Sequence, residues 1–308
     1  MACAAVLACR PGPGRVAHHV TVTGIHLAIQ VLTCSALVGL LAGVGLRLTV
    51  NDVKGALKRC HLTAIVLINF FGIPVLTLAG ASCFGLKLHT AVAMLLLAAS
   101  PFAPVVPVFA RMARADLALA AGLTASFPLM AILLTPLVAQ TGLRILGNAD
   151  GLEFNMLTSL VTLVATISLP LVMGILVRHW APNVGQRLLR PMEIISEATG
   201  AVSLAFVTVT EFGSIINLGW KAWLSMALIS EISLMAGWVV GGPTRGSRQV
   251  VALGTSNRNI ALALLIAVQS FPGSPVVSAV VGNGLLLIGL GLLHVGWWRL
   301  TAKERPAG

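Results

Sequence analysis

Long apolar runs separated by short polar connections dominate this chain. Nine such runs can be drawn, at about 21–46, 61–81, 89–110, 117–140, 156–178, 194–213, 220–241, 249–270 and 275–298. A helix needs about 20 apolar residues to cross a bilayer, and its backbone groups must be satisfied inside the segment. The pattern predicts an all-α polytopic membrane protein of about nine transmembrane helices. Residues 21–298 would form one transmembrane domain with halves at about 21–140 and 156–298.

Two of the nine runs are interrupted. The third contains Pro101, Pro104 and Pro107, and proline removes a backbone donor and clashes with the preceding turn. The eighth contains the sequence GTSNRN, which begins at Gly254. Interrupted helices in corresponding positions of two halves point to a transporter binding site. These are the third of four runs and the fourth of five, so they correspond if the first half lacks its opening helix. The pattern predicts an inverted-repeat transporter with two broken crossover helices, the third and eighth spans.

Arg258 lies near the middle of the eighth run, where a charge is costly. Insertion scales put an arginine at the centre of a membrane helix at about 2.5 to 3.5 kcal/mol, so it requires a partner or a ligand. Its planar guanidinium can bind a carboxylate, or it can act as a tethered positive charge. A salt bridge that only locks the crossing is the structural alternative. Asn257 and Asn259 flank Arg258 and are further candidates for substrate binding.

Glu231 is the expected partner of Arg258, because it lies in the middle of the preceding run, 220–241, at similar depth. An isolated carboxylate there would take up a proton rather than stay charged. Glu231 is therefore expected to be a permanent counter-charge or a proton relay.

The charge distribution predicts the orientation of the helices. Only 9% of the residues are charged, against about 25% in a soluble domain. The net charge of +11 does not indicate nucleic-acid binding, because the basic residues lie in short clusters between apolar runs. Fourteen of the 20 Lys and Arg residues lie on one set of alternate connections and five on the other. The positive-inside rule then places the N-terminus outside and the C-terminus in the cytoplasm. A flexible external arm is expected at 1–20 and a cytoplasmic tail at 299–308.

Several kinds of chemistry have no support in the sequence. The five cysteines form no CxxC pair and show no Cys/His metal spacing, so we expect no metal site and no cofactor. The motifs HExxH and GxSxG are absent, and an intramembrane enzyme is the least favoured class. A membrane protein that binds or senses without transporting, with its crossing locked by an Arg–Glu pair, is the main alternative to a transporter.

Four segments together resemble the bile acid:sodium symporter family. Residues 45–74 resemble the family stretch of glycine-leucine, threonine and aspartate, followed by a helix that ends in a polar residue and proline. Residues 97–136 resemble the next two helices, with Leu123-Thr124 and Leu134-Thr135-Pro136 in their places. The segment GTSNRNIALALLIAV resembles the second crossover helix and residues 275–298 the last helix. The resemblance covers nearly everything after about residue 30, and it depends on the order and spacing of these motifs.

The resemblance implies inverted five-helix repeats with a panel part and a core part. Some members lack the first helix, which would give nine spans. Two unwound helices would cross near the midplane of the core, and sodium ions and an organic anion would bind around that crossing.

The sodium ligands of the family are only partly matched. Asn69 falls where the family has a ligand-bearing glutamine, and Thr124 matches a ligand threonine. Gly254 and Arg258 stand in place of a ligand glutamate and glutamine. Val106 and Pro107 replace a serine-asparagine pair. A guanidinium offers no oxygen to sodium and repels a cation in low dielectric. We therefore expect a secondary transporter of a small organic anion, with Asn69, Thr124 and Arg258 at the site and weak dependence on sodium. Substrate identity, direction and oligomeric state stay open.

Overall fold

The computed structural model describes residues 13–47, 61–147 and 154–303, and side chains within 27–47, 61–147 and 154–301. All regular elements in these ranges are helical. The first half comprises α1 (Pro13–Arg47), α3 (Leu62–Leu67), the π-helix η1 (Ile68–Gly72), α4 (Ile73–Cys83), α5 (Leu88–Ala98), α6 (Val106–Ala113) and α7 (Leu117–Ile145). The second half comprises α8 (Met156–Leu163), the π-helix η2 (Val164–Ser168), α9 (Leu169–Trp180), α10 (Pro182–Thr210), α11 (Phe212–Ile216), α12 (Trp220–Val240), α13 (Arg245–Ser256), α14 (Ile260–Ser270) and α15 (Val276–Lys303). The prediction of an all-α polytopic membrane protein is confirmed.

Each predicted apolar run contains helix. Eight helical segments of the described chain are long and apolar enough to cross a membrane. The remaining predicted span is the pair α5 and α6, which residues 99–105 separate and neither of which is long enough alone. A total of nine spans therefore depends on counting this pair as one crossing.

The helix ends differ from the predicted ends where polar residues continue a helix. α10 begins at Pro182, twelve residues before the predicted start at 194, because hydropathy marks the apolar part of a helix and not its polar first turns. α15 continues to Lys303, so residues 299–303 of the expected tail are helical. α1 begins at Pro13, so residues 13–20 of the expected arm are helical as well. Residues 1–12 and 304–308 of the expected arm and tail lie outside the described residues.

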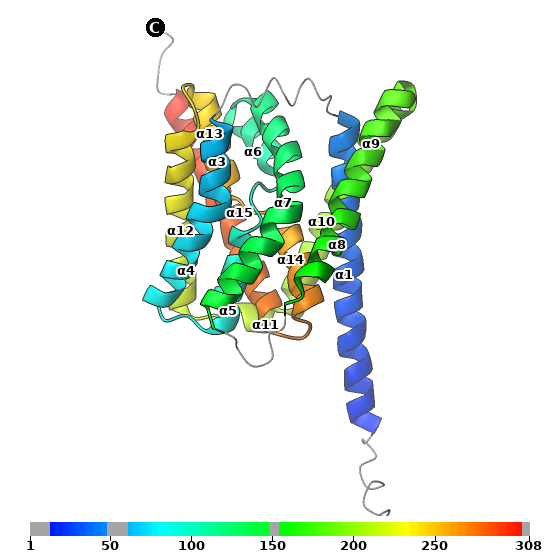
Figure 1. Cartoon of the computed structure of the whole chain (residues 1–308), viewed down its shortest axis with the longest axis vertical. Coiled ribbons are helices and arrows are strands. Elements are labelled where there is room, and N and C mark those ends of the chain that lie inside the picture. Colours follow the sequence, from blue (N-terminus) through cyan, green and yellow to red (C-terminus); the bar gives the residue numbers. More distant parts are fainter. Residues whose placement is uncertain (1–12, 48–60, 148–153, 304–308) are drawn as a thin grey trace, which may run out of the picture.

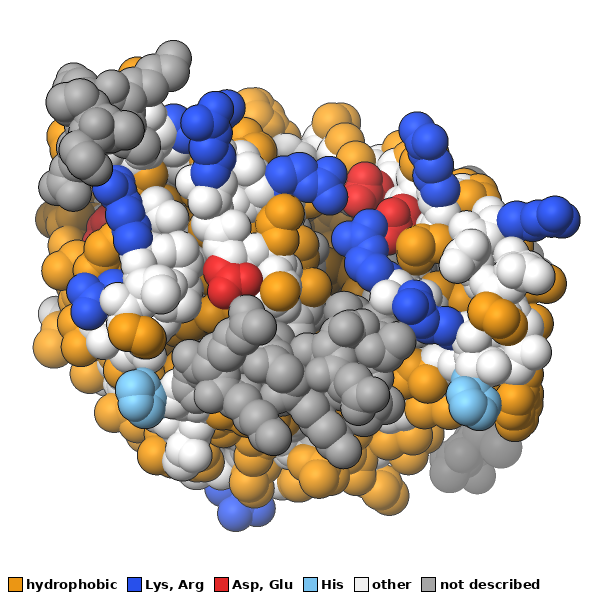
Figure 2. Space-filling model, turned by 90° about the horizontal axis from the view of Figure 1, so that it is seen from above, with side chains coloured by type: hydrophobic (Ala, Val, Ile, Leu, Met, Phe, Trp, Pro, Cys, Tyr) orange, Lys and Arg blue, Asp and Glu red, His pale blue; other side chains and the backbone are white. Residues whose placement is uncertain are grey.

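Successive spans run in alternating directions through the bundle (Figure 1). The described N-terminal end of α1 and the C-terminal end of α15 lie at opposite ends of the molecule, as an odd number of crossings requires. The face that carries the α15 end is rich in Lys and Arg side chains (Figure 2). This agrees with the alternating charge pattern of the connections, while the assignment of that face to the cytoplasm stays a prediction.

The helices form two groups. α1 packs along α9 and α10, and the remaining helices pack around α5, α7, α13 and α15 (Figure 1). Gly45 of α1 and Gly174 of α9 let two backbones approach closely, because a Cβ added at either would meet main-chain atoms of the other helix. Such close approach through small residues is typical of helix pairs in membranes.

The pair α13–α14 lies at the centre of the larger group. In the most apolar window of this segment 89% of the residues are buried, against 17% in α10. A polar break in α13–α14 is therefore surrounded by protein, as a broken helix at membrane depth requires.

Two π-helices interrupt the spans next to prolines. η1 ends at Gly72, two residues before Pro74, and η2 ends at Ser168, two residues before Pro170. A proline lacks the donor for the carbonyl four residues earlier and its ring crowds that carbonyl, so the preceding turn widens. Such π-bulges are frequent at functional sites, and η1 contains Asn69.

Candidate functional site: a crossing of two broken helices

The two breaks contact each other through their main chains. The amide nitrogen of Phe102 donates to the carbonyl oxygen of Gly254 at 3.3 Å, and that of Ala103 donates to Asn257 at 3.1 Å. In the opposite direction, the amide of Asn259 donates to the carbonyl of Ser100 at 2.8 Å. Each break thus supplies hydrogen-bond partners for groups that its own helix leaves free.

The three prolines play different parts in the first break. Pro101 and Pro104 lie in the non-helical stretch between α5 and α6, whereas Pro107 lies in the first turn of α6. A missing amide costs nothing in the first turn of a helix, so Pro107 starts α6 rather than interrupting it. Between Pro101 and Pro104, Phe102 adopts a left-handed backbone conformation with φ of +59°.

Gly254 is required by the ring of Phe102. A Cβ built at Gly254 would overlap three ring atoms of Phe102. The Phe102 ring lies against Phe127 of α7 with centroids 4.1 Å apart, so it has little room to move away. The space that a side chain at position 254 would need is thus filled by an aromatic ring.

The second break is held by its own asparagines. The Oδ1 atom of Asn259 accepts from the amide of Leu262 at 3.1 Å and caps the start of α14. The Nδ2 atom of Asn257 donates to Leu253 at 3.2 Å, and its Oδ1 atom is buried without a partner. Gly291 of α15 leaves the space that the Asn257 side chain occupies.

Arg258 bonds to backbone carbonyls and to no carboxylate. Its side chain is 4% exposed. The Nη1 atom donates to Ala98 at 3.1 Å and lies 3.5 Å from the carbonyl oxygen of Asn69, while Nη2 has no partner. Ala98 is the last residue of α5, where the carbonyl dipoles give the helix end a partial negative charge. The guanidinium thus neutralises this helix end as a bound cation would.

The carbonyls at the end of α5 are all satisfied, and Arg258 completes the set. Thr135 of α7 donates to Ala99 at 2.6 Å, and the Ser100 hydroxyl donates to Leu96 at 2.8 Å. The main chain supplies the partners for Leu95, Leu97 and Ser100. Only the carbonyl of Ala98 depends on a charged side chain.

The prediction that Glu231 forms an ion pair with Arg258 is wrong. The Oε2 atom of Glu231 lies 3.1 Å from Nε2 of His294 on α15, and no ion pair joins it to Arg258. The pair was expected because Glu231 and Arg258 lie at similar depths in their helices. Depth along a helix does not fix the direction in which a side chain points around the helix axis, however. The Glu231 side chain is 42% exposed, away from the buried crossing.

Asn69 belongs to the same cluster as Arg258. Its Nδ2 atom donates to Ile65 at 2.9 Å and to the Thr255 hydroxyl at 3.1 Å, and its Oδ1 atom is buried without a partner. Thr255 lies in the last turn of α13, three residues before Arg258. The π-helix η1 therefore touches the second break through both the side chain and the carbonyl of Asn69.

A small cavity with a mixed polar and apolar lining adjoins Arg258. Its volume is about 20 Å³, and one water needs roughly 10 to 15 Å³ by this measure. The site is thus closed to an organic anion in this conformation. The cavity also borders Asn283 of α15, whose Oδ1 atom is buried without a partner. Asn283 was not among the predicted residues, although it stands between two glycines in an otherwise apolar run. The further polar residues of the lining are Thr77, Ser230, Ser233 and Ser256.

Thr124 borders a different cavity. Its hydroxyl is buried without a partner, and it lines a space of about 80 Å³ with Pro104 and Pro107 on one side and Glu193 and Glu197 of α10 on the other. This cavity lies between the two groups of helices. The structure therefore does not bring Thr124 into the cluster around Arg258.

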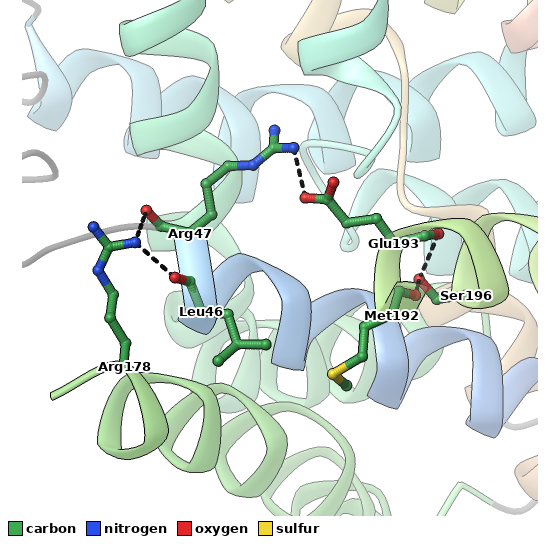
Figure 3. A network of polar contacts seen from close by, with 6 residues as sticks. All are labelled: Leu46, Arg47, Arg178, Met192, Glu193 and Ser196. Atoms are coloured by element: carbon green, nitrogen blue, oxygen red, sulfur yellow. Dashed lines mark hydrogen bonds and ion pairs between the residues drawn. The ribbon is translucent and has the colours of Figure 1, made fainter. Parts of the chain in front are cut away.

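One edge of this second cavity is fixed by a polar network (Figure 3). Arg47 of α1 forms an ion pair with Glu193 at 2.5 Å. Nη1 of Arg178 donates to the carbonyls of Leu46 and Arg47, both at 2.7 Å. The network joins the C-terminal ends of α1 and α9 to Glu193, which lies about three turns into α10. Sequence patterns did not identify Glu193, because it lies in the polar first part of α10 outside the apolar run.

Comparisons with known proteins cover more than half of the chain and part of this site. Residues 34–218, more than half of the chain, match the model of the Sodium Bile acid symporter family. This region includes η1, the first break and Thr124 but not the second break. The chain is also 24% identical over 269 residues to the probable sodium/metabolite cotransporter BASS1, a chloroplastic protein of Arabidopsis thaliana. That alignment covers 85% of this chain and 65% of the relative, so the chain spans less than two thirds of the relative's length.

Proposed function

Because the chain belongs to the sodium bile acid symporter family, we propose that it is a secondary transporter that moves a small organic anion by alternating access. In this proposal the guanidinium of Arg258 replaces a bound cation at the crossing. The observation that carries it is the hydrogen bond from Arg258 to the carbonyl of Ala98 at the end of α5, while no carboxylate of the described residues forms an ion pair with Arg258. Family membership confirms the expectation drawn from the four resembling segments and favours a transporter over an enzyme.

The boundary between the two groups of helices supports alternating access. The two helix groups meet along a cavity that is bounded by α6 and α7 on one side and by α1 and α10 on the other. Arg258 and the crossing belong entirely to the larger group. A rocking motion of one group against the other would open this boundary and leave the crossing intact, which is the usual form of alternating access.

Two positions favour weak sodium coupling. Gly254 and Arg258 stand where the family has ligand oxygens, and here those positions hold an aromatic ring and a guanidinium respectively. Neither group can coordinate sodium. A fixed positive charge at the crossing attracts an anionic substrate without a co-transported cation. The name of the Arabidopsis relative refers to sodium, so sodium dependence of this chain is the point to measure.

The role of Arg258 towards the substrate follows from its free nitrogen. Nη1 is held by the protein, and Nη2 retains a donor for an oxygen of the substrate. Asn257, Asn259 and Asn69 hold the breaks and the π-helix around it. The cavity of about 20 Å³ would have to widen before a carboxylate could reach this donor.

A proton is the second candidate for the coupling ion. The observation that favours it is the pair of Glu231 and His294, which joins two membrane-spanning helices, α12 and α15. A carboxylate and an imidazole at this distance can share and release a proton. Glu231 would then act as a proton carrier and not as the counter-charge of Arg258.

A binding or sensing protein is the remaining alternative. The Arg–Glu lock on which it was based does not form, because Glu231 pairs with His294. Ligand binding in detergent without counterflow in liposomes would favour this alternative. The proposed transporter is tested by uptake into proteoliposomes, after a thermal-shift screen of organic anions has identified a stabilising ligand.

The proposed orientation places the N-terminus outside and the C-terminus in the cytoplasm. A membrane-impermeant cysteine label at each end can check it.

A further inference from the structure

A third and larger cavity lies at the Lys- and Arg-rich end of the bundle, outside the crossing. Its volume is about 760 Å³, within the range of about 300 to 1,000 Å³ that is typical of ligand pockets. It is bounded by the C-terminal end of α6, the N-terminal end of α13 and the last turns of α15. Figure 2 shows the basic face on which these helix ends lie.

Three arginines from three different helices line this cavity. They are Arg114, Arg245 and Arg299. Within the described residues none of them forms an ion pair; Arg245 only approaches the Thr301 hydroxyl, at 3.5 Å. Gly246 of the lining lies against the main chain of Asp116, whose carboxylate accepts a hydrogen bond from the amide of Leu119 as the cap of α7 and forms no ion pair with the three arginines. The cavity therefore holds three positive charges without a counter-charge from the described chain.

Gln249 adds an uncharged polar group to the same lining. It is 5% exposed and lines the cavity. Its side-chain amide carries both donors and an acceptor that an anion with hydroxyl or phosphate groups can use. Gln249 lies one turn from the start of α13, whose first free backbone amides are favourable to an anion.

The backbone at this cavity also departs from the usual pattern. Arg114 ends α6 in a left-handed conformation with φ of +56°, a position at which glycine is the common residue. Gly296 lies within the continuous helix α15, at a point where an added Cβ would meet nothing within 4 Å, so its lack of a side chain leaves space and is not required for packing. Both choices oppose local helix preference and both enlarge or charge the cavity.

We propose that this cavity binds a phosphate-bearing anion. Arginine forks bind phosphate oxygens in pairs, and three guanidiniums exceed what a single carboxylate can accept. Trp298 gives the cavity an apolar wall at the membrane boundary, as an amphipathic phosphate such as a phospholipid headgroup would require. Because α6 and α13 run from this cavity to the two breaks, the bound anion holds together the helices that form the crossing. The site does not depend on the proposed transport function, and binding can be measured without transport.

The test measures melting temperatures of the purified full chain in detergent at constant ionic strength. The added ligands are dihexanoyl phosphatidylglycerol, dihexanoyl phosphatidylcholine and inorganic phosphate, with potassium chloride as the reference. Stabilisation by phosphatidylglycerol but not by the other two supports a headgroup site. Stabilisation by inorganic phosphate as well supports a site for soluble phosphates too. No stabilisation by either phosphate anion overturns the proposal.

Matched variants separate the cavity from general surface charge. Arg245→Gln/Arg299→Gln removes two cavity charges, and Arg187→Gln/Arg190→Gln removes two exposed charges of α10 that line none of the cavities described above. The first pair should weaken the apparent affinity at least about tenfold, since hydrogen bonds to charged groups are the strong ones, and the second should leave it unchanged. Equal weakening by both pairs contradicts the proposal. Gly296→Leu leaves the charge unchanged and fills the space, so ligand stabilisation that persists undiminished in this variant also contradicts it.

Discussion

Arg258 donates a hydrogen bond from Nη1 to the carbonyl of Ala98 at 3.1 Å, across the crossing of two broken helices. The bond joins the second break to the end of α5, and among the residues that the structure describes the guanidinium has no acidic partner. In the proposed function this guanidinium, which bonds to the helix-end carbonyl of Ala98, has the electrostatic role of a bound metal cation but cannot leave.

Replacement of Arg258 by glutamine should abolish transport of an anionic substrate. The shorter neutral side chain removes both the positive charge at the crossing and the bond to Ala98, which as a charged hydrogen bond is worth about 1.5 to 3 kcal/mol, so no group is left at the crossing to attract an anion. The measurement is initial uptake into proteoliposomes. Arg190→Gln, at an exposed position of α10, is the matched control and should transport normally. Arg258→Lys separates charge from geometry and should retain partial uptake if the charge alone matters.

Gly254→Ala should destabilise the protein, because the new Cβ overlaps the ring of Phe102. Overpacking of this kind costs about 1 to 3 kcal/mol, and the melting temperature in detergent would report it. The double variant Gly254→Ala/Phe102→Leu should recover part of the loss. Gly289→Ala is the control, since an added Cβ there meets nothing within 4 Å. Equal melting temperatures for the two alanine variants would show that Phe102 does not fill the site.

Thr135→Val should also lower stability, because it leaves the carbonyl of Ala99 without its partner. A buried unsatisfied carbonyl costs about 1 to 3 kcal/mol. Thr141→Val is a suitable comparison, since Thr141 lies six residues further along α7 and bonds only to its own helix. If both variants melt at the same temperature, the hydrogen bond from Thr135 does not contribute to the crossing.

Glu231→Gln distinguishes a proton carrier from a structural pair. If Glu231 exchanges a proton with His294 during transport, the variant should lose stimulation of uptake by a pH gradient but retain counterflow without a gradient. Loss of counterflow as well would assign the pair a structural role. Uptake and pH stimulation that match the unmodified protein would remove Glu231 from the mechanism altogether.

The helices could be predicted from the sequence because a membrane imposes a length and an apolar composition on each span. The two breaks could be predicted for the same reason, since three prolines and the GTSNRN segment oppose a continuous helix. The start of α10 at Pro182 could not, because polar residues continue that helix beyond the apolar run.

The contacts within the candidate site were harder to predict from the sequence than the helices. The cost of burying Arg258 predicts that a partner exists, but the identity of that partner depends on how helices are rotated against one another. The carbonyl of Ala98 takes the place that Glu231 was expected to fill, and main-chain acceptors leave no signature in a sequence. The direction in which Thr124 points could not be predicted either, because it also depends on how the helices are rotated, and Thr124 lines another cavity. Asn283 was missed although it is a polar residue in an apolar run.

Uptake of a stabilising organic anion into proteoliposomes, with and without an inward sodium gradient, tests the central claim most directly when the unmodified chain and Arg258→Gln are compared. The fixed charge at the crossing predicts similar uptake by the unmodified chain under both conditions and none by the variant. A steep, saturable sodium requirement, or near-normal uptake by Arg258→Gln, would contradict the account.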